Sequence, residues 1–222
     1  MAHTTKQPIY QITPWEVTEL IEDSAKAEHF RKFYYQGESI FALGNGYIGL
    51  RGSFEEGLAH ARHPNTGKLT GTTHYSVNGT YLNGLYESKK IVYPESGYGF
   101  AENSQTMLNV PNGKLIEVRL GDDREVFTLD TGKLIRFERI LDMRAGVLTR
   151  QVVWRSKKKK GRDIMLTVKR LVSFAFPNIA AISFTLTPAL AEQVQITSIL
   201  DANVENVSAH GGDPRVGSHL EG

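Results

Sequence analysis

Between Lys114 and Leu200 the sequence alternates polar and apolar residues with a period of two, and turn-forming residues interrupt it at short, regular intervals. In the stretch 162–174, for example, Ile164, Leu166 and Val168 fall on one face of an extended chain and the intervening residues fall on the other. This pattern is typical of strands in a sheet that has one buried and one solvated face. It excludes a helical architecture for this part of the chain.

Seven strand-like runs fill this region, at residues 114–120, 124–130, 133–143, 147–155, 162–174, 179–187 and 193–200. Glycine, Asn and Asp separate many of them, as in hairpin turns, because glycine accepts the positive φ that tight turns require. We therefore predict an all-β fold, a large antiparallel β-sandwich with at most short helices.

The first 110 residues are less regular. Residues 15–22 fit either a strand or a helix, and we favour a strand because the runs after them are also strand-like. Residues 24–35 could hold a short helix, and a long loop is expected between about residues 52 and 75.

Composition removes several classes of protein. The chain has 222 residues, enough to bury a core without disulfides or metals, and no cysteine, which excludes thiolate zinc sites, iron–sulfur clusters and a cysteine nucleophile. A net charge of +2 does not favour nucleic acid as a partner. Neither a signal peptide nor an apolar stretch of about 18 residues is visible, so we expect no membrane contact and a cytoplasmic protein.

The segment from Gly44 to Gly49 fits the dinucleotide pattern G-x-G-x-x-G. That site needs a helix that opens at the glycines and an acidic residue roughly 20 positions later. Here Gly52 and Gly57 fall where the helix would run, and residues 57–86 contain no acid. Bends in a sheet, or close packing of backbone, explain these glycines better than a nucleotide.

The same acid-free stretch carries five basic or histidine side chains, His60, Arg62, His63, Lys68 and His74. They could form an electropositive loop that attracts an anion such as phosphate, or they could be ordinary solvated side chains. The three histidines could also be imagined as zinc ligands. A loop rich in Gly, Pro and Asn is a poor frame for such a site, because catalytic zinc ligands sit on rigid elements.

No catalytic group stands out elsewhere in the chain. Glu55 and Glu56, with Glu38, could supply a carboxylate pair for sugar chemistry, but adjacent residues of a strand point to opposite faces, so Glu55 and Glu56 could not both serve. No G-x-S-x-G nucleophile elbow is present. We therefore predict no catalytic residue and no metal site in this chain.

Residues 38–52 resemble the signature near the start of glycoside hydrolase family 65, which includes maltose, trehalose, kojibiose and nigerose phosphorylases. Segments 79–87, 141–154, 170–173 and 198–206 are similar to later family segments and keep their order. The signature residues, to which we assign a structural role, are Glu38, Gly44, Asn45, Gly46, Gly49, Arg51 and Gly52.

The resemblance implies that residues 1–222 form a single N-terminal β-sandwich domain of the supersandwich type, cut short at its C-terminal end. The catalytic (α/α)6 barrel of such enzymes would be absent from this chain. They cleave α-linked disaccharides by phosphorolysis with inversion, without a cofactor, and inorganic phosphate is their co-substrate. The chain itself is expected to be non-catalytic, whether it is a fragment or the remnant of a truncated gene.

Two hypotheses account for such a chain. In the first, the domain packs on the catalytic barrel and shapes its entrance. Arg62, His63, Lys68 and His74 would then face the active site as a phosphate loop. A homo-oligomer is also compatible with this hypothesis. In the second, the chain is an independent carbohydrate-binding module that stacks exposed aromatics on sugar rings. We favour the first, because most candidate aromatics lie in strand-like runs and are expected to be core: Trp15, Phe30, Phe33, Tyr34, Tyr35, Tyr47, Tyr81, Tyr86, Trp154 and Phe174.

Overall fold

The computed structural model describes residues 10–22, 36–57, 79–93, 95, 97–204 and 206. This part of the chain is mostly strand, and its helical conformation is confined to residues 36–40. No helix in it is long and apolar enough to cross a membrane. The strands are β1 (Tyr10–Ile12), β2 (Glu16–Ile21), β3 (Leu43–Gly44), β4 (Ile48–Leu50), β5 (Thr80–Lys90), β6 (Asn103–Asn109), β7 (Asn112–Leu120), β8 (Glu125–Val126), β9 (Lys133–Asp142), β10 (Val147–Arg155), β11 (Asp163–Val172), β12 (Ala180–Pro188) and β13 (Val194–Asp201).

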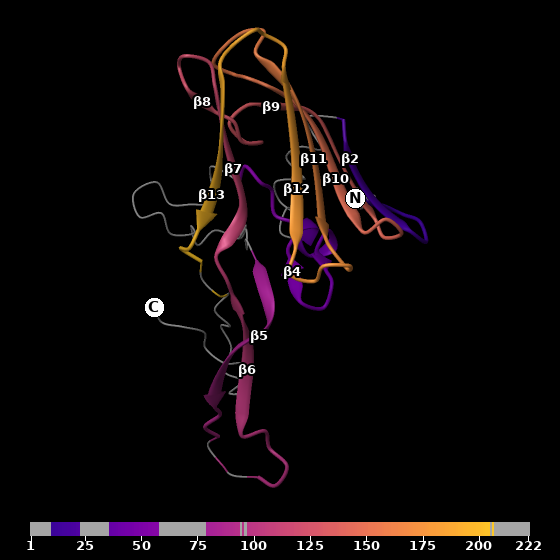
Figure 1. Cartoon of the computed structure of the whole chain (residues 1–222), viewed down its shortest axis with the longest axis vertical. Helices are drawn as coiled ribbons and strands as arrows, with labels where there is room; N and C mark the ends of the chain where they lie inside the picture. The colour runs from indigo at the N-terminus through magenta and orange to yellow at the C-terminus, as the bar shows by residue number, and fades with distance from the viewer. Residues whose placement is uncertain are drawn as a thin grey trace, which may run out of the picture.

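The strands form three antiparallel sheets (Figure 1). The largest has six strands in the order β1-β2-β9-β10-β11-β12, the second has the order β13-β7-β8, and the third has the order β3-β4-β5-β6. The predicted all-β sandwich is thus confirmed.

The main core lies between the six-stranded sheet and the β13-β7-β8 sheet. Trp154 of β10 is fully buried, and its ring meets that of Phe127 edge-on, with the centroids 5.3 Å apart. The alternation around it is the one the sequence predicts, because Ile164, Leu166 and Val168 of β11 are all buried. Burying each such aliphatic side chain contributes about 1.5–3 kcal/mol, so this layer is a major source of stability.

A second, smaller core fixes the β3–β4 hairpin to one end of the large sheet. Phe41, Leu43 and Leu50 pack there against Leu148 of β10 and Val172 of β11. This contact brings the glycine-rich segment 44–52 next to strands that are more than 90 residues away in sequence.

Most of the predicted strand runs are confirmed. The runs at 114–120, 133–143, 147–155, 162–174, 179–187 and 193–200 correspond to β7 and to β9 through β13, and residues 15–22 contain β2. The run 124–130 is mostly wrong, because only Glu125 and Val126 are in a strand. Thr128 and Thr131 close a turn there through backbone and hydroxyl hydrogen bonds, while Phe127 stays buried without belonging to a strand. The expected helix at 24–35 lies outside the described residues.

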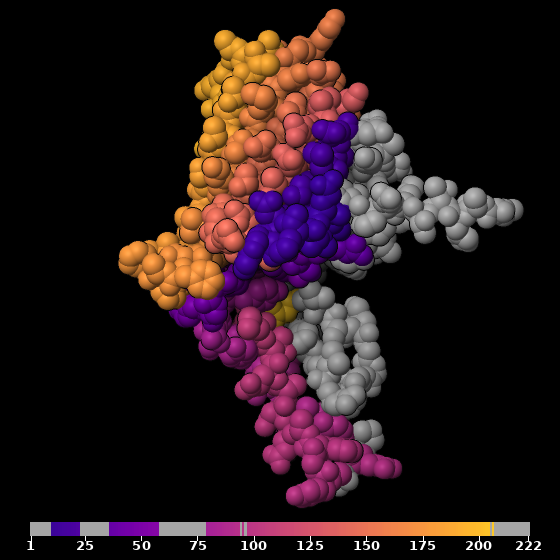
Figure 2. Space-filling model, turned by 90° about the vertical axis from the view of Figure 1, so that its right-hand side faces the viewer, coloured from indigo at the N-terminus to yellow at the C-terminus, as the bar shows by residue number. Residues whose placement is uncertain are grey.

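Strands β5 and β6 form an arm that projects from one end of the sandwich (Figures 1 and 2). The arm continues the sandwich at its base, where β5 pairs with β4 and β6 leads through Pro111 into β7. The pairing register shifts between Tyr81 and Tyr86, and Gly84 there has a positive φ of 96°. A bulge of this kind bends a strand and redirects the rest of it.

Candidate functional site

The pattern from Gly44 to Gly49 forms a tight hairpin between β3 and β4. Gly46 has φ of 88°, in the region that favours glycine. The Asn45 side-chain oxygen accepts hydrogen bonds from the backbone N–H groups of Tyr47 and Ile48, at 2.9 and 2.8 Å. No helix begins at these glycines, so the interpretation as a bend in a sheet is confirmed and a dinucleotide site of this type is excluded.

Asn45 also fixes the hairpin to a distant turn. Its side-chain N–H group donates to the carbonyl oxygens of Ser173 and Pro177, at 2.6 and 2.9 Å. One side chain therefore closes its own turn and ties it to the β11–β12 connection, which explains why an amide is needed between two glycines.

Gly52 ends the signature at a point of close backbone approach. Its N–H donates to the carbonyl of Glu38 at 2.7 Å, and a Cβ atom at this position would lie 2.8 Å from the Phe41 carbonyl oxygen. Glu38 is fully buried, with its carboxylate 3.6 Å from the Arg51 guanidinium. Only glycine fits at position 52, so the signature residues meet in one packed unit.

Three arginines from adjacent strands point into the sandwich beside this unit. Arg139 of β9 and Arg150 of β10 are direct cross-strand partners, and Arg170 of β11 lies on the same face, one strand further. All three are at most 4% exposed. Like charges placed directly opposite on one face are destabilising, and a buried unpaired charge costs several kcal/mol. The sheet therefore needs carboxylates here.

Those carboxylates come from β2 and from the segment after Gly52. Glu19 accepts a hydrogen bond from Arg139 Nε at 2.5 Å. Glu56 binds Arg150 through both oxygens, at 2.6 and 2.5 Å, and Glu55 lies between Arg150, at 2.7 Å, and Arg170, which it also contacts. Three arginines thus face three glutamates, and the cluster is balanced in charge.

The expectation that Glu55 and Glu56 point to opposite faces is wrong. They lie in a turn, not in a strand, and both side chains reach the same guanidinium of Arg150. Their full engagement by arginine still argues against a catalytic pair, since neither carboxylate is available to a substrate.

Phe54 fills the space between the charged groups. Its ring lies 4.6 Å from the Arg150 guanidinium carbon and 5.4 Å from that of Arg139. Phe41 covers Arg139 from another side, at 4.1 Å. Such cation–π contacts are worth more when both groups are removed from water.

The carboxylates respond differently to this environment. Burial alone would raise the pKa of Glu55, but the charges and hydrogen bonds of Arg170 and Arg150 outweigh it and hold the pKa below its ordinary value. For Glu19 burial prevails over the single partner Arg139, and the pKa is raised. Glu55 is thus the firmly ionised centre of the cluster.

The space inside the cluster is too small for a substrate. The cavity lined by Ser53, Glu55, Arg139, Arg150 and Arg170 has a volume of about 10 Å³, which one water molecule would fill. Within the described ranges, no group of three His, Cys, Asp or Glu side chains could hold a metal ion. The cluster is therefore built to hold the segment 51–57 on the sheet.

Lys114 of β7 approaches the same charges from the opposite sheet. Its ammonium group donates to the Gly79 carbonyl at 3.2 Å and to the Thr80 hydroxyl at 2.7 Å, where the chain enters β5. Burial, followed by the charge of Arg170, lowers its pKa to about 7, although Glu55 and Glu38 oppose the shift. Lys114 therefore changes charge near neutral pH.

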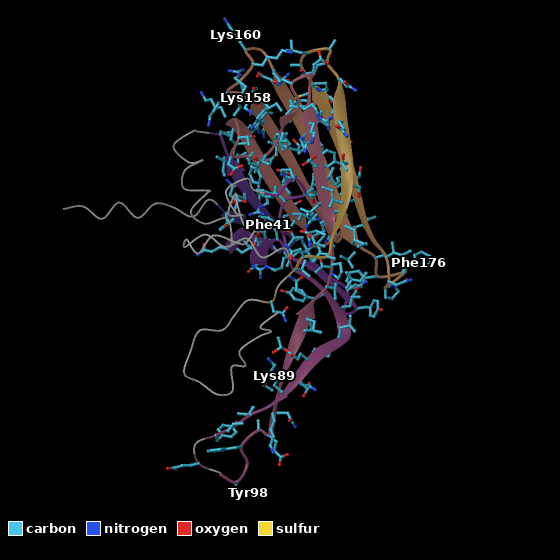
Figure 3. All side chains as sticks on the ribbon, turned by 90° about the vertical axis from the view of Figure 1, so that its left-hand side faces the viewer. Phe41, Lys89, Tyr98, Lys158, Lys160 and Phe176 are labelled. Atoms are coloured by element: carbon cyan, nitrogen blue, oxygen red, sulfur yellow. The ribbon has the colours of Figure 1, made fainter. Side chains whose placement is uncertain are left out.

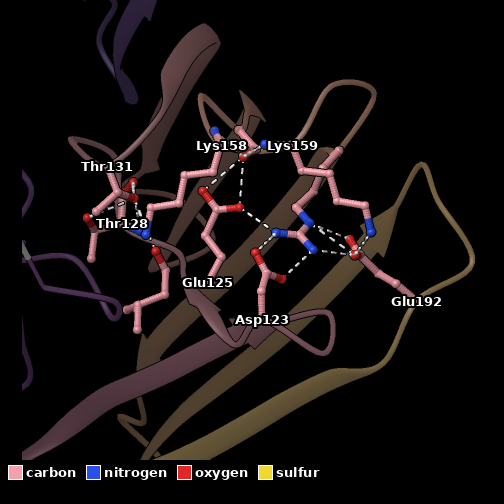
Figure 4. Close-up of polar contacts among 10 residues, drawn as sticks. Asp123, Glu125, Thr128, Thr131, Lys158, Lys159 and Glu192 are labelled. Carbon is pink, nitrogen blue, oxygen red and sulfur yellow. Dashed lines mark hydrogen bonds and ion pairs between the residues drawn. The ribbon is translucent and has the colours of Figure 1, made fainter.

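A second charged cluster surrounds a single arginine, Arg162, and includes three carboxylates (Figure 4). Arg162 binds Asp123 at 2.7 Å, Glu125 at 2.6 Å and Glu192 at 3.0 Å, and Ser156 donates to Glu125 at 2.7 Å. These contacts anchor the lysine-rich turn at 157–160, whose side chains are exposed. The turn is an exposed hairpin tip between β10 and β11.

Comparison with known proteins agrees with this architecture. Residues 27–222 match the family described as "Glycosyl hydrolase family 65, N-terminal domain". The chain belongs to glycosyl hydrolase family 65. The sequence resemblance to this family is thereby confirmed.

The relatives of this family 65 chain include phosphorylases. An α,α-trehalose phosphorylase of Thermoanaerobacter brockii is 41% identical over the whole chain, which covers 26% of that protein. One from Geobacillus stearothermophilus is 34% identical over 82% of the chain and 22% of that protein. A solved human-microbiome protein assigned as a kojibiose phosphorylase shares the fold, with a TM-score of 0.67 and 23% identity over 88% of this chain and 23% of its own. The chain thus spans about a quarter of the length of these relatives.

The residues predicted for the phosphate loop are not placed. Arg62, His63, Lys68 and His74 all lie outside the described residues, as do Phe30, Phe33, Tyr34 and Tyr35 of the aromatic set. Within the described residues, the expectation that the aromatics are core holds for Trp154 but is wrong for four others. Trp15, Tyr47, Tyr86 and Phe174 are exposed.

Sequence reasoning missed the three buried arginines of this family 65 domain, although the signal was present. In β10 the apolar face reads Leu148, Arg150, Val152 and Trp154, so an arginine takes a core position of the alternation. The same break occurs at Arg139 and Arg170. A cation on the apolar face of three strands, with an acidic pair upstream, would have predicted the cluster.

The first prediction concerns Arg150. Replacing it with Met leaves Glu55 and Glu56 buried without their shared cation, and we expect the free energy of unfolding to fall by about 3–5 kcal/mol. Urea denaturation measures this. The matched control is Arg155→Met in the same strand, which removes an exposed ion pair to Asp163 and should change stability little. Equal midpoints for the two variants would contradict a structural role for the cluster.

The second prediction concerns pH. Because the pKa of Lys114 is about 7 in the folded chain, against an ordinary value of 10.5, the unfolded state binds more protons between these values and stability rises with pH. From pH 6 to pH 9, wild type should gain on the order of 2 kcal/mol relative to Lys114→Met. Urea denaturation at both pH values tests this, with exposed Lys169→Met as control. A difference in unfolding free energy between wild type and Lys114→Met that is the same at pH 6 and pH 9 contradicts the prediction.

Proposed function

We propose that this chain is the non-catalytic N-terminal β-sandwich of an inverting α-glucoside phosphorylase, and that it packs on a catalytic barrel and shapes its entrance. The family and the phosphorylase relatives support the reaction class. One structural observation supports the non-catalytic role. Glu55 and Glu56 are the acidic pair that could have served sugar chemistry, but both are bound by buried arginines around a cavity of about 10 Å³.

The proposed reaction balances without a cofactor. An oxygen of hydrogen phosphate attacks the anomeric carbon as the bond to the glycosidic oxygen breaks, and a general acid outside this chain gives its proton to the leaving sugar. The proton that the phosphate group loses then restores the general acid. Inversion converts the α-linkage into β-glucose 1-phosphate. We place this reaction in the cytoplasm. The substrate to test first is α,α-trehalose, because a trehalose phosphorylase is 41% identical over the whole chain.

The third prediction tests this function. The full-length protein, incubated with phosphate and either trehalose, kojibiose or maltose, should release β-glucose 1-phosphate from one of them, and the 222-residue chain alone should release none. ³¹P NMR measures the phosphate-dependent release of β-glucose 1-phosphate by the full-length protein and by the 222-residue chain. Release by the isolated chain would overturn the non-catalytic role, and hydrolysis without phosphate by the full-length protein would overturn the reaction class.

The same enzyme tests the phosphate loop that we propose at the barrel entrance. Arg62→Ala combined with His74→Ala should raise the KM for phosphate and leave the KM for the disaccharide unchanged, because a positive field concentrates the anion. Lys158→Ala combined with Lys160→Ala, in the exposed turn at residues 157–160 (Figure 3), is the control. An unchanged KM for phosphate would make the loop an ordinary solvated segment.

A further inference from the structure

The β5–β6 arm is an ordered hairpin that lies outside the two hydrophobic cores of this domain. Backbone pairing runs from Tyr86–Met107 to Lys90–Asn103, and the Ile91 N–H donates to the Glu102 carbonyl at 2.8 Å beyond it. At the tip, the rings of Tyr93 and Phe100 lie 4.9 Å apart, and the Tyr93 hydroxyl donates to the Ala101 carbonyl at 3.0 Å. The arm therefore has a defined shape.

This arm displays apolar side chains on its surface. Tyr98 at the tip is fully exposed, Val92 is 81% exposed and Phe100 is 54% exposed. Leu85, Tyr86 and Met107 add exposed apolar surface along the strands. A two-stranded ribbon is marginally stable in water, and an exposed apolar patch marks a surface that contacts another molecule or domain.

The low net charge of the arm excludes partners that bind through strongly charged surfaces. Residues 80–110 carry three Glu and two Lys, so the arm has almost no net charge. It offers neither a basic stripe for phosphate groups nor a one-sided acidic face. Exposed tyrosine and phenylalanine, with few charges around them, are typical of the centre of a protein–protein contact.

The path of the chain indicates which protein surface that is. β13 returns along β7 as far as the pair Asp201–Asn112, beside the base of the arm. Asn206, the last described residue, accepts a hydrogen bond from the Asn109 backbone N–H at 2.7 Å, at the end of β6. A polypeptide that continues from this point starts beside the arm, and the relatives are about four times as long as this chain.

We propose that the β5–β6 arm is the docking element for the part of the full-length polypeptide that comes after this domain. This inference rests on the proposed function, in which that part is the catalytic barrel. The arm contributes Val92, Tyr98 and Phe100 as apolar anchors, and the bulge at Gly84 sets its direction. Its partner is an apolar surface of the same chain.

Photo-crosslinking in the full-length protein tests the docking. Tyr98 is replaced by p-benzoylphenylalanine, a substitution that full exposure makes safe for folding. Lys160, exposed at the opposite end of the molecule (Figure 3), carries the same group in the control. We expect links from position 98 to peptides beyond residue 222 of the same chain, and none from position 160.

Two results would overturn the docking. Crosslinks between isotopically distinct copies would show that the partner is a second copy of the chain. The absence of crosslinks from position 98 would show that the arm contacts no other part of the protein. As a second measurement, Val92→Ser combined with Tyr98→Ser should lower the thermal midpoint of the full-length protein more than the exposed control Met165→Ser; equal midpoints contradict the proposal. Phosphorolysis of any of the three disaccharides without crosslinks contradicts the docking alone, whereas crosslinks without phosphorolysis of any of them contradict the proposed function alone.

Discussion

Three arginines on the inner face of one sheet are the constraint on which the rest of this structure depends. Arg139, Arg150 and Arg170 stand in core positions of neighbouring strands, where hydrophobic side chains would normally lie. Leaving three such charges buried without partners would cost a free energy comparable to the whole stability of an ordinary domain. The sheet can form only if carboxylates reach this face, and two of the three come from the turn at 55–56.

That requirement explains the glycine signature. The segment 51–57 must pass close to Phe41 and beneath the arginines, so position 52 has no room for a side chain. The same segment joins the opposite sheet, because the Glu55 carbonyl accepts a hydrogen bond from the Ile116 N–H at 2.8 Å. Gly52 therefore lets the charged turn at 55–56 pass between the two sheets, while the nucleotide-like pattern from Gly44 to Gly49 forms the hairpin that precedes it.

The sequence predicted the fold well and the site poorly, for physical reasons. Alternation in β10 and β11 is a local property, readable from residues two positions apart, so these strands and their buried faces could be predicted. The run at 124–130 also alternates, but the Thr131 hydroxyl bonds the backbone of Thr128 and closes a turn there. Such side-chain hydrogen bonds decide between strand and turn, and polar–apolar alternation does not reveal them.

The cluster depends on contacts that sequence spacing does not reveal. Glu55 and Arg170 are 115 positions apart, and their meeting depends on strand register and on the turn that directs both acids to one side. The assumption that residues 55 and 56 are in a strand hid this. What sequence could have shown is the anomaly itself, an arginine on the apolar face of three strands. The family relation, by contrast, was accessible from the glycine-rich segment 38–52 and the order of the later family-like segments.

A double-mutant cycle between Arg170 and Glu55 tests the central claim most directly. The unfolding free energies of wild type, Arg170→Met, Glu55→Gln and the double variant give the coupling between the two side chains. If the buried cluster holds the signature segment on the sheet, each single change is strongly destabilising and the coupling exceeds about 2 kcal/mol. Additive effects, with a coupling below about 0.5 kcal/mol, would contradict the account.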